Sequence, residues 1–137
     1  AREALEFLGA APPPAGRARL RLGVVLQRQG RWEDADAQFN RLIHDFPETM
    51  PAEAAGRRVH ATAWTVQAGA FRDRRRAEEL AKRLGAAGLD ARVDPAQQGG
   101  KLYHRVQIGR QATYEQAEQV RSRVRRHQAD AFVTVTR

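Results

Sequence analysis

The sequence predicts an α+β protein in which an all-α hairpin precedes a β-α-β-β-α-β unit. The four strands of that unit form one antiparallel sheet with two helices on one face. Two observations predict this fold. A strand–helix–strand pattern begins near Trp64 and begins again forty residues later without a gap. Ahead of it, residues 17–47 carry apolar side chains at helical spacing in two stretches.

Residues 1–16 are expected to form a helix remnant and a proline-rich linker. Arg2 to Leu8 has helical composition, and the three prolines from Pro12 to Pro14 end that helix because proline cannot continue one. We assign residues 10–16 to the linker. The chain begins with Ala1 inside an expected helix, which indicates a piece of a longer protein.

Residues 17–62 are predicted to form a helical hairpin followed by a short capping helix. The first helix stops at Gly30, which suits a left-handed C-terminal position, and the second ends before Pro47. Small residues at Gly23 and Ala35 allow the two helices to approach closely, and Phe39 fills the space between them. A further helix is expected over residues 52–59.

Nine residues of this hairpin follow a recognisable spacing: Leu22, Gly23, Leu26, Gly30, Trp32, Ala35, Phe39, Leu42 and Pro47. In this spacing the hairpin resembles one tetratricopeptide repeat. One such repeat buries too little surface alone. We therefore expect residues 2–8, residues 51–60, the second domain or another copy to cover its open side, and we expect the repeat to dock a protein partner.

Residues 63–137 carry the duplicated unit. The first strand is expected over residues 64–68, with Gly69 ending it, and Asp73 caps the following helix. The second strand covers residues 89–93 and is closed by Pro95; a turn at 97–101 leads to the third, residues 102–108. Thr113 caps a helix from residue 114 to about 127, and residues 131–136 form the last strand.

The repeat aligns side chains of the same kind. Val66, Gln67 and Gly69 fall on Val106, Gln107 and Gly109 after a shift of forty residues. Right-handed crossovers place both helices on one side of the sheet, so that the other face is left open to solvent. We expect the functional surface of this domain to lie on that open face.

Alternation along the strands assigns nine side chains to the open face. They are Thr65, Gln67, Asp90, Arg92, Tyr103, Arg105, Gln107, Phe132 and Thr134. Aromatic rings beside planar polar groups suit a ligand with apolar faces and hydroxyl or amide groups. The alternative is that Tyr103 and Phe132 only form a stabilising cross-strand pair.

Charge is concentrated in the second domain. Residues 1–62 hold nine Arg and eight acidic residues, a net charge of +1, whereas residues 63–137 hold fifteen Lys or Arg and eight acidic residues, a net charge of +7. A basic surface favours polyanions such as nucleic acid, membranes or an acidic wall polymer, although an ordinary solvated Arg-rich surface would look the same. No run of apolar residues is long enough to span a bilayer, so membrane attachment is expected only through a part of the parent chain outside this sequence.

Neither a catalytic site nor a metal or cofactor site is expected. The four histidines have no ligand spacing, cysteine is absent, and Gly99-Gly100 is a turn and not a phosphate-binding loop. The chain is therefore predicted to act by binding and not as an enzyme.

Two segments of residues 63–137, Val66 to Phe71 and Tyr103 to Gly109, stand in register with Ala77-Glu78 and Ala117-Glu118. Through these segments residues 63–137 resemble a SPOR domain. The resemblance implies a sheet surface that binds septal peptidoglycan, with a preference for glycan strands from which amidases have removed the stem peptides. Members are typically periplasmic or envelope proteins of bacterial division and wall remodelling.

The resemblance also implies glycan-binding positions. The family's sheet glutamine falls on Gln67, and the residue after the first glycine on Ala70, where serine is often found. The aromatic and basic positions of the third strand fall on Tyr103 and Arg105, and the apolar position of the last strand on Phe132. Together with neighbouring side chains, the expected site is Gln67, Ala70, Arg72, Arg92, Tyr103, Arg105, Gln107 and Phe132.

The preference for strands without stem peptides has a physical reason in this sequence. Removal of the stem peptide leaves a free lactyl carboxylate on each muramic acid. Arg105, with Arg92 or Arg72 nearby, is expected to make charge-assisted contacts to that anion.

RNA binding is the alternative function, because the same strand–helix order occurs in the RNA-recognition motif and the domain is basic. That motif stacks bases on aromatic residues of its first and third strands. Here the first-strand position is Gln67, and the third strand lacks the motif's Lys/Arg-Gly-Phe run, so we expect no nucleic acid partner.

Overall fold

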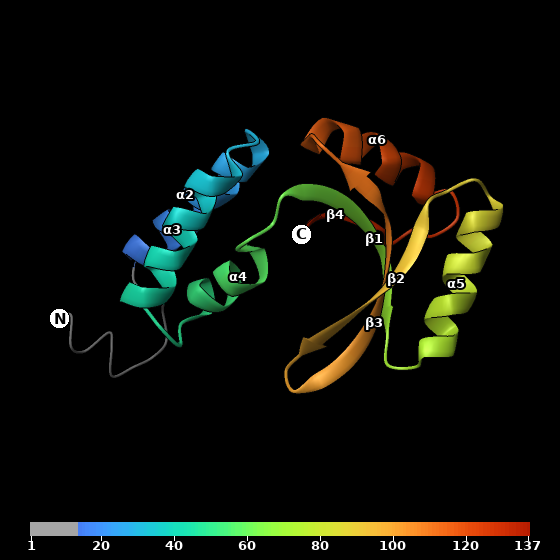
Figure 1. The fold of residues 1–137 in the computed structure, drawn as a ribbon, viewed down its shortest axis with the longest axis horizontal. Coiled ribbons are helices and arrows are strands. Elements are labelled where there is room, and N and C mark those ends of the chain that lie inside the picture. Colours follow the sequence, from blue (N-terminus) through green and yellow to red (C-terminus); the bar gives the residue numbers. More distant parts are fainter. Residues whose placement is uncertain (1–13) are drawn as a thin grey trace. The chain divides into compact units, whose positions relative to one another are not determined.

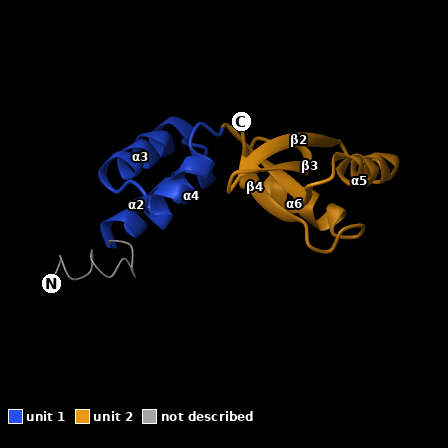
Figure 2. Cartoon of the chain, turned by 90° about the horizontal axis from the view of Figure 1, so that it is seen from below, with its two compact units in different colours: residues 1–61 blue, residues 62–137 orange. Residues whose placement is uncertain are grey.

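The computed structural model describes residues 14–137, which form two compact units divided between Ala61 and Thr62. Figure 1 shows the course of the chain, and Figure 2 distinguishes the two units by colour. Each unit has its own hydrophobic core. The expected helix at residues 2–8 lies outside the described residues.

The described part of the first unit, residues 14–61, contains three helices: α2 (Pro14–Arg28), α3 (Trp32–Asp45) and α4 (Met50–Arg58). Pro14 begins α2, where the missing N–H of proline removes no hydrogen bond. The prediction that residues 14–16 belong to a linker is therefore wrong. Gly30 has φ +76° between α2 and α3, in agreement with the expected left-handed position.

The helices α2 and α3 approach closely at Gly23. A Cβ atom on Gly23 would lie 2.3 Å from Cε1 of Phe39, so only glycine fits there. Phe39, Ala35 and Leu42 are fully buried in the interface, which confirms the predicted packing of the hairpin. The resemblance to a tetratricopeptide repeat stays a prediction.

The third helix covers one side of this hairpin. The hydroxyl of Thr49 caps α4 by accepting from the N–H of Ala52 at 3.3 Å, and Ala55 and Val59 join the core. Residues 51–60 thus supply part of the expected cover. Leu22 and Val25 on α2 stay 45% and 48% exposed.

A buried glutamine ties α2 to the end of α4. Gln27 is completely buried, and its Nε2 donates to the carbonyl of Arg58 at 2.9 Å while its Oε1 accepts from Arg58 Nε at 2.9 Å. Burial, and secondarily the charge of Arg28, lowers the pKa of the Arg58 guanidinium.

The second unit is a four-stranded antiparallel sheet in the order β2-β3-β1-β4. Its strands are β1 (Ala63–Phe71), β2 (Ala91–Gln98), β3 (Lys101–Gln111) and β4 (Phe132–Thr136), and its helices are α5 (Arg74–Ala86) and α6 (Tyr114–Val124). Both helices pack on the same face of the sheet, and no helix of this unit covers the other face (Figure 1). The predicted α+β fold is confirmed.

Both helices of this unit begin as the sequence predicts. The carboxylate of Asp73 accepts from the N–H of Arg75 at 2.9 Å, and Thr113 and Gln116 form a reciprocal capping box. The buried stripes also repeat at helical spacing. They consist of Ala77, Leu80 and Leu84 on α5 and of Ala117, Val120 and Val124 on α6.

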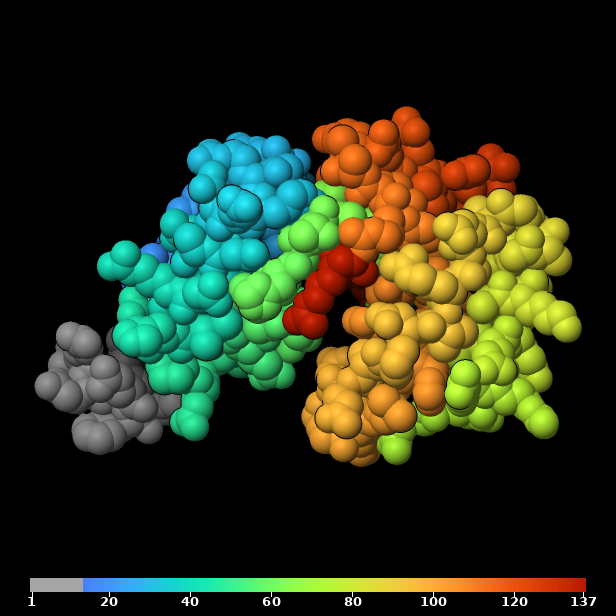
Figure 3. Space-filling model, viewed as in Figure 1, coloured from blue at the N-terminus to red at the C-terminus, as the bar shows by residue number. Residues whose placement is uncertain are grey.

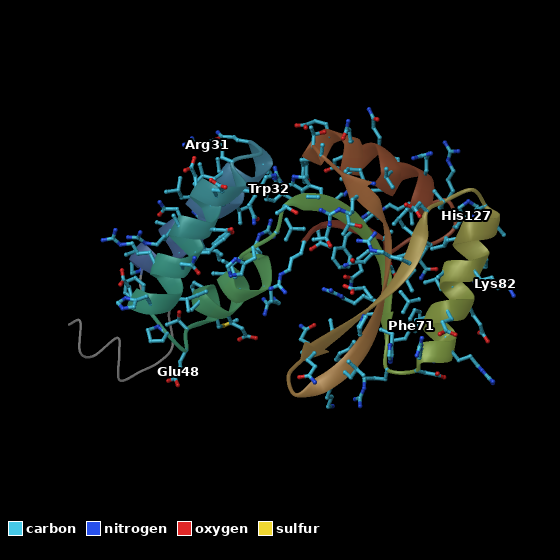
Figure 4. All side chains as sticks on the ribbon, in the orientation of Figure 1. Arg31, Trp32, Glu48, Phe71, Lys82 and His127 are labelled. Atoms are coloured by element: carbon cyan, nitrogen blue, oxygen red, sulfur yellow. The ribbon has the colours of Figure 1, made fainter. Side chains whose placement is uncertain are left out.

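The first strand does not end at Gly69, as predicted, but continues to Phe71. The pairing of β1 with β3 shifts between Gln67 and Gly69, so that Ala68 is an extra residue in a β-bulge. A Cβ on Gly69 would lie 3.0 Å from the ring of Phe71, which packs against the core on the helix side (Figure 4). The glycine therefore allows the bulge and the inward turn of Phe71.

The second strand does not end at Pro95 either. Pro95 pairs with His104 inside β2, because β2 is an edge strand and the missing N–H faces no neighbour. The hairpin of β2 and β3 thereby extends to a turn at Gly99 and Gly100, whose tip lies at the surface (Figure 3). Leu102 neighbours Tyr103 and belongs by alternation to the helix side, but it is 46% exposed near this tip.

None of the described helices combines the length and apolar character that a membrane span requires.

Candidate functional site

The open face of the sheet carries a row of four side chains, one from each strand. Arg92 of β2 pairs with Gln107 of β3, Gln107 with Gln67 of β1, and Gln67 with Phe132 of β4. Directly paired residues of antiparallel strands point to the same face. The row therefore joins four of the predicted site residues.

Arg92 closes one part of this face. Its Nη1 donates to the carbonyl of Gly109 at 2.8 Å, and its Nη2 donates to Oε1 of Gln107 at 3.2 Å and to Oγ1 of Thr136 at 3.5 Å. Since Arg92 and Thr136 belong to opposite edge strands, the face is concave enough for their side chains to meet.

Two residues assigned to the open face are buried in this closed part. Gln107 is completely buried, and its Nε2 has no hydrogen-bond partner among the described residues. Thr65 is also completely buried, and its hydroxyl lies 3.1 and 2.8 Å from the carbonyls of Ile108 and Gly109, at the other irregularity of the β1–β3 pairing. The expectation that Thr65 and Gln107 face solvent is wrong, because Arg92 is hydrogen-bonded to the Gln107 amide and the Thr65 hydroxyl is directed to backbone carbonyls of β3.

The bulge at Ala68 reverses the alternation beyond it. Strict alternation from Val66 would turn Ala70 toward the helices, but the extra residue pairs Ala70 with Arg105. Ala70 is exposed at this position. The expected site residues Ala70 and Arg105 therefore lie side by side on the open face.

Arg105 forms an ion pair across the β2–β3 ladder. Its Nη2 donates to Oδ2 of Asp94 at 2.5 Å, and the two side chains are 34% and 40% exposed. The Nε atom of Arg105 is buried and has no hydrogen-bond partner among the described residues. The guanidinium thus reaches solvent through its terminal nitrogens, next to a carboxylate.

Arg72 lies on the ring of Tyr103. The Cζ atom of Arg72 is 5.6 Å from the ring centroid, within the range of a cation–π interaction. Arg72 is exposed, whereas Tyr103 is half-buried. The contact holds a cation beside the aromatic surface at one end of the face.

The accessible predicted residues form a diagonal across the sheet, which we call the open strip. It consists of Phe132, Gln67, Ala70, Arg105, Tyr103 and Arg72. From strand spacing and rise, the strip is about 20 Å long. Phe132 is 47% exposed at its β4 end. The open strip offers two aromatic rings, an amide and two guanidinium groups. These groups form a binding surface and not a catalytic site.

Two residues beside the open strip are not among those predicted from the sequence. Asp94 lies two residues after Arg92, and Lys101 lies two residues before Tyr103. Residues two apart in a strand share a face, so both lie on the open face. The expected second strand ends at Val93 and the expected third strand begins at Leu102, so neither residue is among those assigned to the open face. The period-two pattern, continued by two residues, would have included both.

A separate shallow hollow lies over α6 and the end of β3. It is lined by Arg110, Gln111, Gln116, Gln119, Val120, Ser122, Arg123 and Arg126. These are mostly exposed, flexible polar side chains outside the open strip, and we assign no role to the hollow. Within residues 14–137, no group of three His, Cys, Asp or Glu side chains is arranged to hold a metal ion.

The second unit matches a known domain family. Residues 61–134 match the family model described as SPOR domain. No curated protein sequence matches the chain.

Two solved structures are similar to this unit. One is the solution structure of the peptidoglycan binding domain of the B. subtilis cell wall lytic enzyme CwlC. It is 32% identical, with a TM-score of 0.43, over 54% of this chain and 89% of that one. The other is the crystal structure of the RlpA SPOR domain from Pseudomonas aeruginosa. It is 20% identical, with a TM-score of 0.43, over 54% of this chain and 97% of that one.

Proposed function

Since this chain belongs to the SPOR domain family through residues 61–134, we propose that its second unit binds peptidoglycan through the open strip. SPOR domains are binding domains and not enzymes, so the unit acts by holding the glycan. The similar B. subtilis domain, itself described as peptidoglycan binding, supports the same ligand.

The observation that carries the proposal is the composition of the open strip. Tyr103 and Phe132 present aromatic surface to sugar faces, while Gln67 between them offers both a donor and an acceptor to hydroxyl or N-acetyl groups. Arg105 and Arg72 add cationic donors on the same face. No helix of this unit obstructs a polymer laid along it.

The direct contacts we propose are those of the open strip, and Arg92 and Gln107 support them from beneath. Arg92 holds Gln107, and Gln107 is the β3 neighbour of Gln67. Ala70 contributes its backbone and a small side chain, which leaves room for the ligand beside Arg105.

The preferred ligand is septal glycan that has lost its stem peptides. Loss of the peptide removes bulk from the strand and leaves a carboxylate on each muramic acid. Charge-assisted hydrogen bonds to a carboxylate are stronger than those between neutral groups, and the second unit has a net charge of +7 over residues 63–137. Both effects favour the peptide-free strand.

Pelleting with purified sacculi tests this function. We expect the wild-type chain to pellet with sacculi, more strongly after amidase treatment, and a Tyr103→Ala/Arg105→Ala variant to stay folded and lose binding. Equal binding to treated and untreated sacculi would refute the preference for the peptide-free strand. Binding to oligonucleotides that falls steeply with salt would instead indicate the RNA alternative.

For the helical unit we propose docking of a protein partner in cell division or wall remodelling, in the periplasm or envelope. Leu22 and Val25, one helical turn apart on α2, present an exposed apolar surface for it. A Leu22→Glu/Val25→Glu variant is expected to pellet with sacculi like the wild type. Loss of sacculus binding in this variant would contradict the division of roles between the two units.

A further inference from the structure

The three arginines of the predicted site differ in the partners that their guanidinium groups already have within the protein. The Arg92 guanidinium is taken up by Gly109, Gln107 and Thr136. Arg105 is paired with Asp94. Arg72 has only the ring of Tyr103 as a partner within the described part of the chain.

We infer that Arg72, and not Arg105, contacts the anionic group of the ligand, and that Asp94 restricts Arg105 to neutral polar groups. This inference rests on the proposed glycan binding. It assigns Asp94 as a specificity-determining residue. Arg72 then recognises the charge of the ligand, and Arg105 recognises its neutral sugar groups.

Asp94 largely cancels the charge of Arg105. The two residues are direct partners on neighbouring strands, and their side chains meet at 2.5 Å. A ligand carboxylate brought to Arg105 would also be brought close to the Asp94 carboxylate, and like charges repel. Since Arg105 Nε is buried, the anion would have to share the terminal nitrogens with Asp94.

The same pair fits a neutral group that both donates and accepts. Arg105 offers N–H donors and Asp94 offers carboxylate acceptors side by side. An acetamido group has a carbonyl for the first and an N–H for the second, and a sugar hydroxyl serves either one. The pair is therefore suited to amino sugars whether or not their stem peptide is present.

The surroundings of Arg72 favour an anion. Its chain neighbour Asp73 is engaged as the cap of α5, where its Oδ1 accepts from the N–H of Arg75. The N-terminal end of α5 contributes partial positive charge, and the helix has no acidic residue in its first turn. Arg74 is paired with Glu78, but Arg75 and Arg76 are exposed and add to the positive potential.

The ring of Tyr103 positions this cation. With Arg72 Cζ at 5.6 Å from the ring centroid, the guanidinium stands beside any sugar that contacts Tyr103. A lactyl carboxylate on that sugar then lies within reach of Arg72, whereas Arg105 contacts the sugar's neutral groups.

Single substitutions in the full chain test the assignment. Affinity is measured by pelleting with sacculi before and after amidase digestion, at low and at high salt. Arg72→Gln is expected to lower affinity for digested sacculi by about threefold to tenfold and to leave affinity for untreated sacculi nearly unchanged. Arg105→Gln should lower both affinities by a similar factor, so that their ratio is kept.

Asp94→Asn gives the opposite signature. It frees the charge of Arg105, so that affinity for digested sacculi should be higher than that of the wild type. This affinity should also decrease more steeply as the salt concentration is raised. Lys82→Gln is the matched control, since it removes one exposed positive charge from α5 about 12 Å beyond the helix start, away from Arg72. It should change neither affinity, and circular dichroism should show all variants folded.

The inference is overturned if Arg105→Gln abolishes the preference for digested sacculi while Arg72→Gln retains it. It is equally overturned if Asp94→Asn leaves affinity and salt dependence as in the wild type. A wild-type chain that binds neither kind of sacculus overturns the proposed function itself, a result that differs from both.

Discussion

Two residues, Gly23 and Arg92, are tightly constrained by their tertiary contacts. Gly23 leaves no room for a Cβ because the Phe39 ring lies 2.3 Å from where it would be, and Phe39 is fully buried. Arg92 is equally constrained, since its guanidinium spans groups from two other strands. The sequence predicts a close helix approach at Gly23 and places Arg92 on the open face, but only the tertiary contacts show how tightly each residue is held.

Gly23→Ala is expected to destabilise the helical unit. Because Phe39 cannot move outward, the added methyl group should cost about 1–3 kcal/mol in the free energy of unfolding. Thermal denaturation followed by circular dichroism measures the loss. Gly56→Ala is the matched control, since nothing lies within 4 Å of its added Cβ in α4, and it should be neutral or stabilising. Equal effects of the two substitutions would contradict the close approach.

Arg92→Ala is expected to act on stability as well as on binding. It removes the hydrogen bonds to Gly109 and Gln107 and should cost about 1–3 kcal/mol, measured as a lower urea midpoint. Arg83→Ala is the control, because Arg83 is exposed and has one contact of 3.5 Å, to Gln128. An Arg92→Ala variant with wild-type stability but no sacculus binding would instead make Arg92 a direct ligand contact.

Among the elements, the ends of strands and helices position the site. The open strip requires that β1 continue through its bulge to Phe71 and that β2 continue through Pro95. The first brings Ala70 beside Arg105, and the second brings Asp94 beside the same residue. The helices pack on the opposite face and fix the sheet that carries the strip.

Thr113→Ala tests the start of α6. It removes the hydroxyl that accepts from the Gln116 N–H at 3.1 Å and should cost about 0.5–2 kcal/mol in the stability of the second unit. Thr113→Ser keeps the hydroxyl and should retain most of the stability. Urea denaturation separates the two variants. Similar losses in both would mean that the capping box contributes little.

At the scale of the whole molecule, the second unit contains all that the proposed binding needs. Its core consists of residues between Val66 and Ala131, with Val133 packed against it, and its four strands pair only with one another. All residues of the open strip belong to it as well.

Residues 62–137 produced alone are therefore expected to fold and to bind sacculi with the affinity of the whole chain. A cooperative thermal transition and the pelleting assay check the two parts of this prediction. The Tyr103→Ala/Arg105→Ala variant of the same fragment serves as the non-binding control. A folded fragment that no longer binds would place part of the glycan site in the first unit.

The sequence by itself determined the order of the elements and most of the core. Apolar spacing, capping residues and an internal repeat are local properties, so they identified both helices of the second unit, their buried stripes and the central pair Gln67 and Gln107. The resemblance carried by segments between Val66 and Glu118 identified the family.

Only the tertiary structure decided which of these side chains a ligand can reach. A bulge of one residue reverses alternation, so Ala70 and Phe71 exchange the faces that counting assigns them. Curvature brings Arg92 over Gln107, and strand pairing brings Asp94 onto Arg105. These outcomes depend on contacts between residues far apart in the chain, which no local pattern of the sequence encodes.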